Sequence, residues 1–272
     1  MFNAMDEQMI LAQISDPHLR ADGGALCNHV DSLAAMNSCI KHLNNLRPRP
    51  DVVVITGDLV NGPEDYPGLK HMLNDLTMPC YVIPGNHDFP VPMRDSFSEY
   101  GYLPADGFMN YVVEDFPLRL IMLDTGVPGQ VAGAMCGTRL RWLDERLSEK
   151  PKRPTVICMH HPPTATGIVY MDRHGLLNGG PAMEKIIRRH PQVERILCGH
   201  VHRPVTIGWA GTIVSTAPSI SFQMLFDLRE DAASGYVMEP PACPIFLWRP
   251  DMGLAGHLSF IGDYGPPRPF KG

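Results

Sequence analysis

The feature that most constrains the fold of this chain is a regular alternation of short β-rich runs with longer amphipathic stretches. In residues 30–46, apolar side chains recur at three- and four-residue steps, which predicts a helix with one buried face. Residues 51–56 form a short apolar run that is typical of a buried strand. We expect strands at residues 9–15, 51–56, 81–83, 110–113, 118–123, 155–159, 195–198, 205–209 and 212–215, and helices at residues 30–46, 65–76, 138–147 and 182–189. Such an alternation predicts an α/β architecture centred on sheets.

The C-terminal part of the chain has a different pattern. Short β candidates at residues 235–238, 245–248 and 256–261 are separated by proline and glycine and show no helical periodicity. We expect residues 223–272 to form a small β-rich extension. It is either an edge or oligomer-forming segment, or a terminal sheet that covers the core.

Composition excludes several classes of protein. Lysine and arginine number 23 against 29 aspartate and glutamate, a net charge of −6, so neither a nucleic-acid polymer nor an anionic membrane is an expected partner. The apolar runs are far too short to cross a bilayer, and the acidic residues 1–7 lack the features of a secretory signal. The seven cysteines form no C-x-x-C pair, which indicates reduced thiols in a cytoplasmic protein.

Five clusters of metal-compatible side chains follow predicted strands directly. In open α/β sheets, ligands bind at the carboxyl ends of the strands, so we expect these clusters to meet at one edge. A single histidine in such a place would carry little weight, but five polar clusters at five strand ends are hard to ascribe to chance. The clusters are Asp16-Pro17-His18, Gly57-Asp58-Leu59-Val60-Asn61, Gly85-Asn86-His87-Asp88, His160-His161 and Gly199-His200-Val201-His202.

Spacing within two of the clusters suggests how their side chains converge. In an extended segment, residues two apart point the same way and lie about 7 Å from each other. On that basis Asp16 and His18 are expected to converge on one ion, with Pro17 fixing the backbone between them. His200 and His202 are likewise expected to project to one side and to serve one ion each.

The remaining ligands suggest a centre with two metal ions. Such sites hold their ions about 3.5–4 Å apart, so an anion must lie between them. Asp58 is the natural bridge because a carboxylate has two oxygens, while Asn86 offers an amide oxygen and His160 completes the set. Nitrogen and oxygen ligands without thiolate fit Fe, Mn, Zn or Co. Two divalent ions, two carboxylates and a bridging hydroxide leave a formal charge of about +1, which would attract an anionic phosphate.

Together the motifs D-x-H, G-D-x-x-N, G-N-H-D, H and G-H-x-H, between residues 14 and 215, resemble the calcineurin-like metallophosphoesterases. Residues 160–163 and 171–178 look like features of the class III cyclic-nucleotide phosphodiesterases and of the bacterial glycerophosphodiesterases. The resemblance implies a four-layer α-β-β-α sandwich over residues 1–222, and a homodimer or higher homo-oligomer. It implies a first metal held by Asp16, His18, Asp58 and His202, and a second held by Asp58, Asn86, His160 and His200.

Further residues are assigned to the substrate side of the site. His87 is expected to hydrogen-bond the phosphate or to protonate the leaving alkoxide, the alternative being a residue that ties its loop down. His161 is expected to orient the site, and Asn61 either contacts substrate or forms a turn. Asp172 and Asn178 lie in a long loop that we interpret as a wall beside the substrate.

These residues predict hydrolysis of small phosphodiesters by attack of a metal-bridging hydroxide on phosphorus. The sequence places 3′,5′-cyclic nucleotides first among the substrates. Glycerophosphodiesters or other alkyl phosphodiesters are the alternative. A catalytically silent metal-binding interaction module is disfavoured because the ligand set and His87 are intact.

Overall fold

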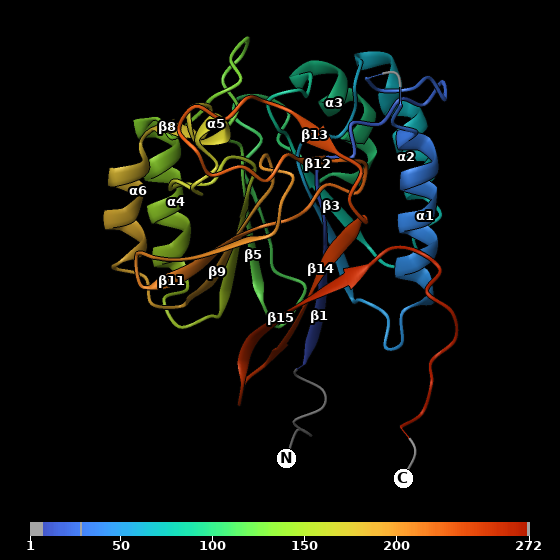
Figure 1. The fold of residues 1–272 in the computed structure, drawn as a ribbon. Helices are drawn as coiled ribbons and strands as arrows, with labels where there is room; N and C mark the ends of the chain where they lie inside the picture. The colour runs from blue at the N-terminus through green and yellow to red at the C-terminus, as the bar shows by residue number, and fades with distance from the viewer. Residues whose placement is uncertain (1–7, 28, 271–272) are drawn as a thin grey trace.

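The computed structural model describes residues 8–27 and 29–270, so the acidic N-terminal segment discussed above lies outside the described residues. Two mixed sheets pack face to face and helices cover both outer faces (Figure 1). The first sheet has the order β15 (Gly253–Phe260), β14 (Ala242–Arg249), β1 (Met9–Ile14), β2 (Val52–Thr56), β3 (Cys80–Ile83). The second has the order β10 (Val205–Trp209), β11 (Thr212–Thr216), β9 (Val193–Cys198), β7 (Thr155–Met159), β5 (Arg119–Leu123), β4 (Tyr111–Val113).

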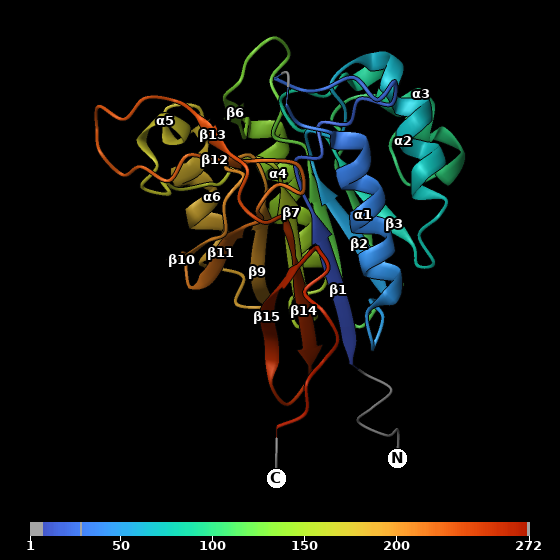
Figure 2. The same ribbon diagram turned by 45° about the vertical axis from the view of Figure 1, so that its right-hand side comes forward.

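Helices lie on the outer face of each sheet because each presents one apolar stripe. Against the first sheet lie α1 (Ser32–Asn45), α2 (Tyr66–Leu73) and α3 (Pro90–Phe97), and against the second lie α4 (Gly137–Glu149) and α6 (Gly180–Ile187). Figure 1 shows α4 and α6 on one side of the strands and α1 and α2 on the other, and the turned view shows the C-terminal strands β14 and β15 beside β1 (Figure 2). The α-β-β-α sandwich expected from the sequence is confirmed.

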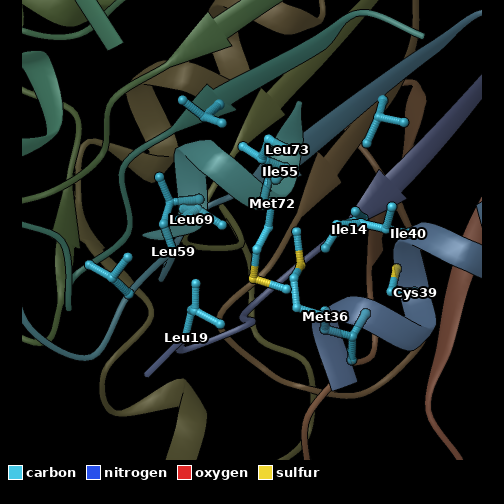
Figure 3. Close-up of a cluster of buried hydrophobic side chains, with 14 of the residues drawn as sticks. Ile14, Leu19, Met36, Cys39, Ile40, Ile55, Leu59, Leu69, Met72 and Leu73 are labelled. Atoms are coloured by element: carbon cyan, nitrogen blue, oxygen red, sulfur yellow. The ribbon is translucent and has the colours of Figure 1, made fainter. Parts of the chain in front are cut away.

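Three apolar clusters hold the layers together. One fills the space between α1, α2 and the first sheet, where Met36 of α1 meets Ile14 and Ile55 of the strands (Figure 3). A second lies between the sheets and includes Leu120 and Trp248, and a third lies between the second sheet and α4 and α6. Strands buried on both faces must be apolar throughout, which explains the continuous valine and isoleucine run of β2.

Local sequence explains where the helices differ from expectation. α1 begins at Ser32 rather than two residues earlier, because the Asp31 carboxylate accepts a hydrogen bond from Ala34 N and caps the helix. The helix predicted at residues 65–76 is shorter in the structure, where α2 covers Tyr66–Leu73 and a 3-10 helix, η1 (Pro63–Asp65), precedes it. Helix α3 was not predicted, since two prolines in its first turn conceal a helical segment.

Residues 242–260 complete the first sheet. β14 runs antiparallel to β1, with Leu11 opposite Phe246, and β15 forms the outer edge. The chain also forms two small sheets, β12 (Gln223–Met224) with β13 (Tyr236–Val237), and β6 (Gly133–Ala134) with β8 (Leu176–Asn178). Two short helices, η2 (Ser98–Tyr100) and α5 (Val169–Asp172), complete the described elements. Among the described residues, no helix has the length and apolarity needed to cross a bilayer.

Strands β1, β2 and β3 are parallel within the first sheet, and β5, β7 and β9 are parallel within the second. Their carboxyl ends therefore define one edge of the sandwich. Three of the five polar clusters begin directly after β2, β7 or β9, and the other two begin two residues after the ends of β1 and β3. The topology thus gathers segments that are far apart in sequence.

Packing between the sheets can be tested with Leu120, which is fully buried in β5. Leu120→Ala is expected to lower the free energy of unfolding by about 3 kcal/mol, because it removes apolar contacts and leaves a cavity. Leu228→Ala, at a side chain that is 54% exposed, is the matched control and should change it by less than about 0.5 kcal/mol. Denaturant unfolding followed by circular dichroism measures both values. Similar values for the two variants would contradict the assignment of Leu120 to the core.

Candidate metal centre

The carboxyl edge of the sandwich brings two groups of ligands together. In the first, one potential ligand atom from each residue lies within 4.8 Å of the others, and all the residues are buried; they are Asp16, His18, Asp58 and His202. The second group, by the same measure, is His160, His161 and His200. Asn86 joins the second group, since its Oδ1 lies 3.1 Å from His160 Nε2 and 3.0 Å from His200 Nδ1.

Asp58 lies between the two groups. Its Oδ2 is 3.5 Å from His18 Nε2 on one side and 3.4 Å from His160 Nε2 on the other. Its Oδ1 accepts a hydrogen bond of 2.8 Å from the backbone N of His87. One carboxylate oxygen thus faces a ligand nitrogen from each group, as a bridging ligand would.

The orientation of the imidazoles fits metal binding. His160 donates from Nδ1 to the carbonyl of Thr56 (2.8 Å), and His202 donates from Nδ1 to the carbonyl of Phe222 (3.2 Å). In neutral rings these bonds fix the tautomer and leave the Nε2 lone pairs facing the carboxylates. His18 Nε2 lies only 3.2 Å from His202 Nε2, and a cation at this position would account for two ring nitrogens that face each other.

The buried carboxylates of the two ligand groups would be stabilised by positive charge. Asp16 is fully buried and Asp58 is 2% exposed, and a buried carboxylate is costly without a compensating charge. Burial lowers the pKa of His160, but the charges of Asp58 and Asp16 outweigh it and raise that pKa to about 9. Burial lowers the pKa of His18 to about 4 and that of His200 to about 3, which keeps these imidazoles neutral. The carboxylate oxygens and imidazole nitrogens of the two ligand groups therefore fit metal cations.

The backbone reaches this arrangement by left-handed turns, which differs from the extended segments expected from the sequence. Positive φ angles are found at five of the ligands: Asp16 (52°), His18 (44°), Asp58 (51°), His200 (69°) and His202 (51°). The side chains converge as predicted, but the geometric reason given for it was wrong. Such conformations cost about 1–3 kcal/mol each and concentrate at functional sites.

Close approach of the loops depends on glycine at two positions. A Cβ at Gly85 would lie 2.2 Å from Asp58 Oδ1 and 2.4 Å from the Asp58 backbone N. A Cβ at Gly199 would lie 2.3 Å from Ser15 Oγ and 2.6 Å from the Thr56 carbonyl. Both glycines are needed because Gly85 packs on the Asp58 loop within the first sheet, and Gly199, which follows β9 of the second sheet, packs on Ser15 and on the end of β2.

Asp88 joins two of the ligand loops. Its carboxylate accepts hydrogen bonds from Leu59 N (3.1 Å), Gly85 N (2.8 Å) and Tyr66 Oη (2.9 Å). Burial, together with the charge of Asp58, raises the pKa of Asp88 to about 7. Asp88 therefore positions the loops that follow β2 and β3 and does not itself face the ligand groups.

A cavity of about 270 Å³ opens over the ligands. His87 and Asn61 line it, and the His87 ring lies 5.0 Å from that of His18. Tyr170 and His174 also line it, and they belong to the long loop that we interpret from the sequence as a wall beside the substrate. The remaining wall residues come from loops in which no motif or periodicity singles them out; they are Leu26, Cys27, Val131, Phe222 and Met224.

Three residues assigned to the substrate side do not line this cavity. His161 is buried, with Nδ1 accepting from the Thr125 hydroxyl (2.8 Å) and Nε2 donating to the Val131 carbonyl (2.9 Å). Asp172 accepts hydrogen bonds from the backbone of Thr166 and Gly167 and borders a neighbouring cavity. Asn178 is exposed at the end of β8. His161 thus acts on the site through the loops it ties, whereas Asp172 shapes the turn at residues 166–172.

A larger cavity, of about 630 Å³, lies at the other end of β3. Tyrosines line it, and no histidine does, so it offers none of the chemistry found at the carboxyl edge. We therefore place the functional centre in the smaller cavity over the ligand groups.

Comparison with known proteins agrees with this geometry. The chain is 40% identical over 264 residues to the probable glycerophosphodiester phosphodiesterase GpdQ of Arcobacter nitrofigilis, covering 96% of this chain and 97% of that one. It is 28% identical to the 3′,5′-cyclic adenosine monophosphate phosphodiesterase CpdA of Escherichia coli, covering 81% and 79% of the two chains.

A solved structure shares the fold at low sequence identity. The dimetal phosphatase of Danio rerio aligns with a TM-score of 0.62 at 14% identity, covering 93% of this chain and 99% of that one. The family model for calcineurin-like phosphoesterases matches residues 9–204, which span every ligand described above. The chain therefore belongs to the calcineurin-like phosphoesterases, a family of metal-dependent hydrolases.

Proposed function

We propose that this protein hydrolyses small phosphodiesters at a centre that holds two metal ions. The observation that carries the proposal is the position of Asp58, whose Oδ2 faces a histidine nitrogen of each ligand group. Bound there, a pair of divalent ions supplies Lewis acidity and lowers the pKa of water towards neutrality. One metal would be held by Asp16, His18, Asp58 and His202, and the other by Asp58, Asn86, His160 and His200.

The chain's own residues orient the substrate and move a proton. The His87 backbone N is fixed on Asp58 Oδ1, which places the imidazole in the wall of the cavity. From that position His87 would donate a proton to the alkoxide that leaves phosphorus, a role that is typically worth 10²–10⁴-fold in rate. The amide of Asn61 lines the same cavity and would hydrogen-bond a phosphate oxygen.

Two substrate classes are candidates for this cavity. Glycerophosphodiesters are favoured because the GpdQ relative is 40% identical to this chain, against 28% for the CpdA relative. Cyclic nucleotides, which the sequence placed first, are the second candidate, since Phe222 and Tyr170 offer aromatic faces on which a base would stack. The cavity of about 270 Å³ suits a small diester.

Homo-oligomer formation, a cytoplasmic location and a division of the chain at residues 222/223 are parts of the same proposal. The C-terminal hairpin supports the use of its exposed edge strand β15 in assembly, since an edge strand presents unpaired backbone groups. All seven cysteines are unpaired in the structure, which suits a reducing compartment.

Removal of metal tests the proposed centre. Dialysis against a chelator is expected to abolish turnover of bis(p-nitrophenyl) phosphate, and added Mn²⁺ should restore it, because no described side chain replaces the Lewis acid. Elemental analysis should find two ions per chain after reconstitution, and one or fewer in Asp58→Ala. A fully reconstituted wild-type protein with a single ion would contradict the proposal.

The role of His87 is tested by comparing two leaving groups. His87→Ala is expected to reduce kcat by about 10²–10⁴-fold with an unactivated alkyl diester, which needs a proton. With bis(p-nitrophenyl) phosphate, whose leaving group needs none, the loss should be much smaller. His71→Ala, at an exposed position on α2, is the control and should leave both rates unchanged. Equal losses on the two substrates would exclude the acid role.

A substrate panel separates the two classes. Glycerophosphocholine and glycerophosphoethanolamine are expected to give a higher kcat/KM than 3′,5′-cyclic AMP. Phe222→Ala should raise KM for cyclic AMP roughly fivefold and raise KM for glycerophosphoethanolamine less. The reason is that it removes a stacking surface for the base, which contributes about 1 kcal/mol to binding. Release of choline and 5′- or 3′-AMP measures the rates, and preference for cyclic AMP would restore the substrate order expected from the sequence.

A further inference from the structure

A further cavity, distinct from the three described above, lies where the two sheets meet at β9 and β15. It has a volume of about 160 Å³. The second sheet contributes Arg195, Thr206 and Ser215 to its lining, and the first sheet contributes Phe246 and Gly256. Along the strands the cavity extends from Arg195, the third residue of β9, to Thr216, which lies beside Cys198 at the carboxyl end of β9, and none of the proposed metal ligands is among its lining residues.

Arg195 is a partly buried cation without a partner in the described part of the chain. Its Nε is buried and has no hydrogen-bond acceptor, and no carboxylate oxygen lies within the 4.0 Å of an ion pair. The preceding Glu194 has its carboxylate near Gly253 instead. Burial lowers the pKa of Arg195 because desolvation disfavours the charged guanidinium.

Other guanidiniums of low exposure in this protein are paired. Arg119 binds Glu114 (2.8 Å) and Glu149 (2.9 Å), and Arg203 binds Glu239 (2.9 Å). Arg195 is half-buried, so its guanidinium is partly desolvated, and an anion beside it would offset that cost. With no ion pair to another described residue, this guanidinium is available to such an anion.

A second polar group in the cavity, the Ser215 hydroxyl, also supports a bound ligand. Ser215 is 8% exposed, and its buried Oγ has no hydrogen-bond partner among the described residues. The strand register places Ile213 beside Arg195 and Ser215 beside Leu197, so both polar side chains leave the sheet on the inter-sheet face. Thr206 lies opposite Ser215 and adds a second hydroxyl on that face.

The cavity also holds the guanidinium in place. Arg195 lies over the Phe246 ring, with 5.4 Å from Cζ to the ring centroid. A Cβ at Gly256 would lie 3.0 Å from the Phe246 ring and 3.6 Å from Arg195 Nη1, so glycine keeps the space beside the guanidinium open. Stacking on an aromatic ring restricts the guanidinium and prepares it for an oxyanion.

From these observations we propose that the cavity between β9, β11 and β15 binds a small oxyanion of the orthophosphate class, held by the Arg195 guanidinium and the Ser215 and Thr206 hydroxyls. A guanidinium binds the oxygens of such an anion through paired N–H donors, and hydroxyls supply the remaining donors. A cavity of about 160 Å³ has room for a tetrahedral oxyanion but not for a nucleotide or a larger diester. The site is independent of the proposed function.

Titration calorimetry with inorganic phosphate, at constant ionic strength in chloride buffer, tests the site on the metal-loaded protein. The wild type is expected to bind one phosphate at this cavity and another at the metal centre. Arg195→Gln should weaken phosphate binding at this cavity by at least about tenfold, because it removes a charge-assisted hydrogen bond. It should leave kcat and KM for bis(p-nitrophenyl) phosphate within twofold, since the metal centre is unchanged.

Two further variants make the test specific. Ser215→Ala removes only a hydroxyl and preserves the strand, and it should weaken phosphate binding at this cavity by about three- to tenfold. Arg249→Gln is the charge control. It removes a guanidinium from an exposed position on the β14–β15 hairpin, where Arg249 pairs with Asp251, and should change the phosphate affinity by less than about twofold. Equal effects of Arg249→Gln and Arg195→Gln would overturn the proposal in favour of a general charge effect.

Asp58→Ala distinguishes this proposal from that for the metal centre. In this variant, phosphate binding at the metal centre should be lost, whereas the phosphate binding that depends on Arg195 should remain. If Arg195→Gln left phosphate binding unchanged, the oxyanion site would be wrong whatever happened at the metals. If phosphate did not bind there and Arg195→Gln dissociated a dimer in size-exclusion chromatography, the guanidinium would pair with a carboxylate of a second copy, which also overturns the proposal.

Discussion

The site depends on the burial of negative charge at the junction of two sheets. Asp58 follows a strand of the first sheet, and it lies 3.4 Å from His160, which follows a strand of the second. A carboxylate that is 2% exposed is stable only when a cation or several donors surround it. The packing of the sandwich therefore decides whether the ligand groups meet, and metal binding would in turn stabilise the sandwich.

Strain in the ligand loops follows from the same requirement. Left-handed conformations at Asp16, Asp58 and His200 turn these side chains towards one another, at a cost that isolated loops would not bear. Hydrogen bonds from Gly85, Leu59 and Tyr66 to Asp88 hold the loops of the first sheet in that form. Rigid strands on one side and tied loops on the other hold the candidate ligand side chains in this arrangement.

The chemistry and its selectivity come from different parts of the chain. The ligands lie in tight turns directly after strands, whereas the walls of the cavity come from long connections such as the one that carries Phe222. Loops tolerate change more readily than strand ends, so changes in these walls would alter the accepted substrate without changing the candidate ligands. The similarity of this chain to proteins named for two substrates agrees with that division.

The sequence alone predicted a sheet-centred α/β architecture and a set of candidate metal ligands, because strand periodicity and polar clusters after strands are local signals, whereas the four-layer sandwich was implied by the resemblance to a known family. It did not show the left-handed turns at the ligands, since dipeptide spacing contains no φ angle. Nor did it reveal helix α3, the distance of Asn178 from the cavity, or the unpaired Arg195. These features depend on contacts between residues that are remote in sequence, and only the packing of one sheet on the other brings such residues together.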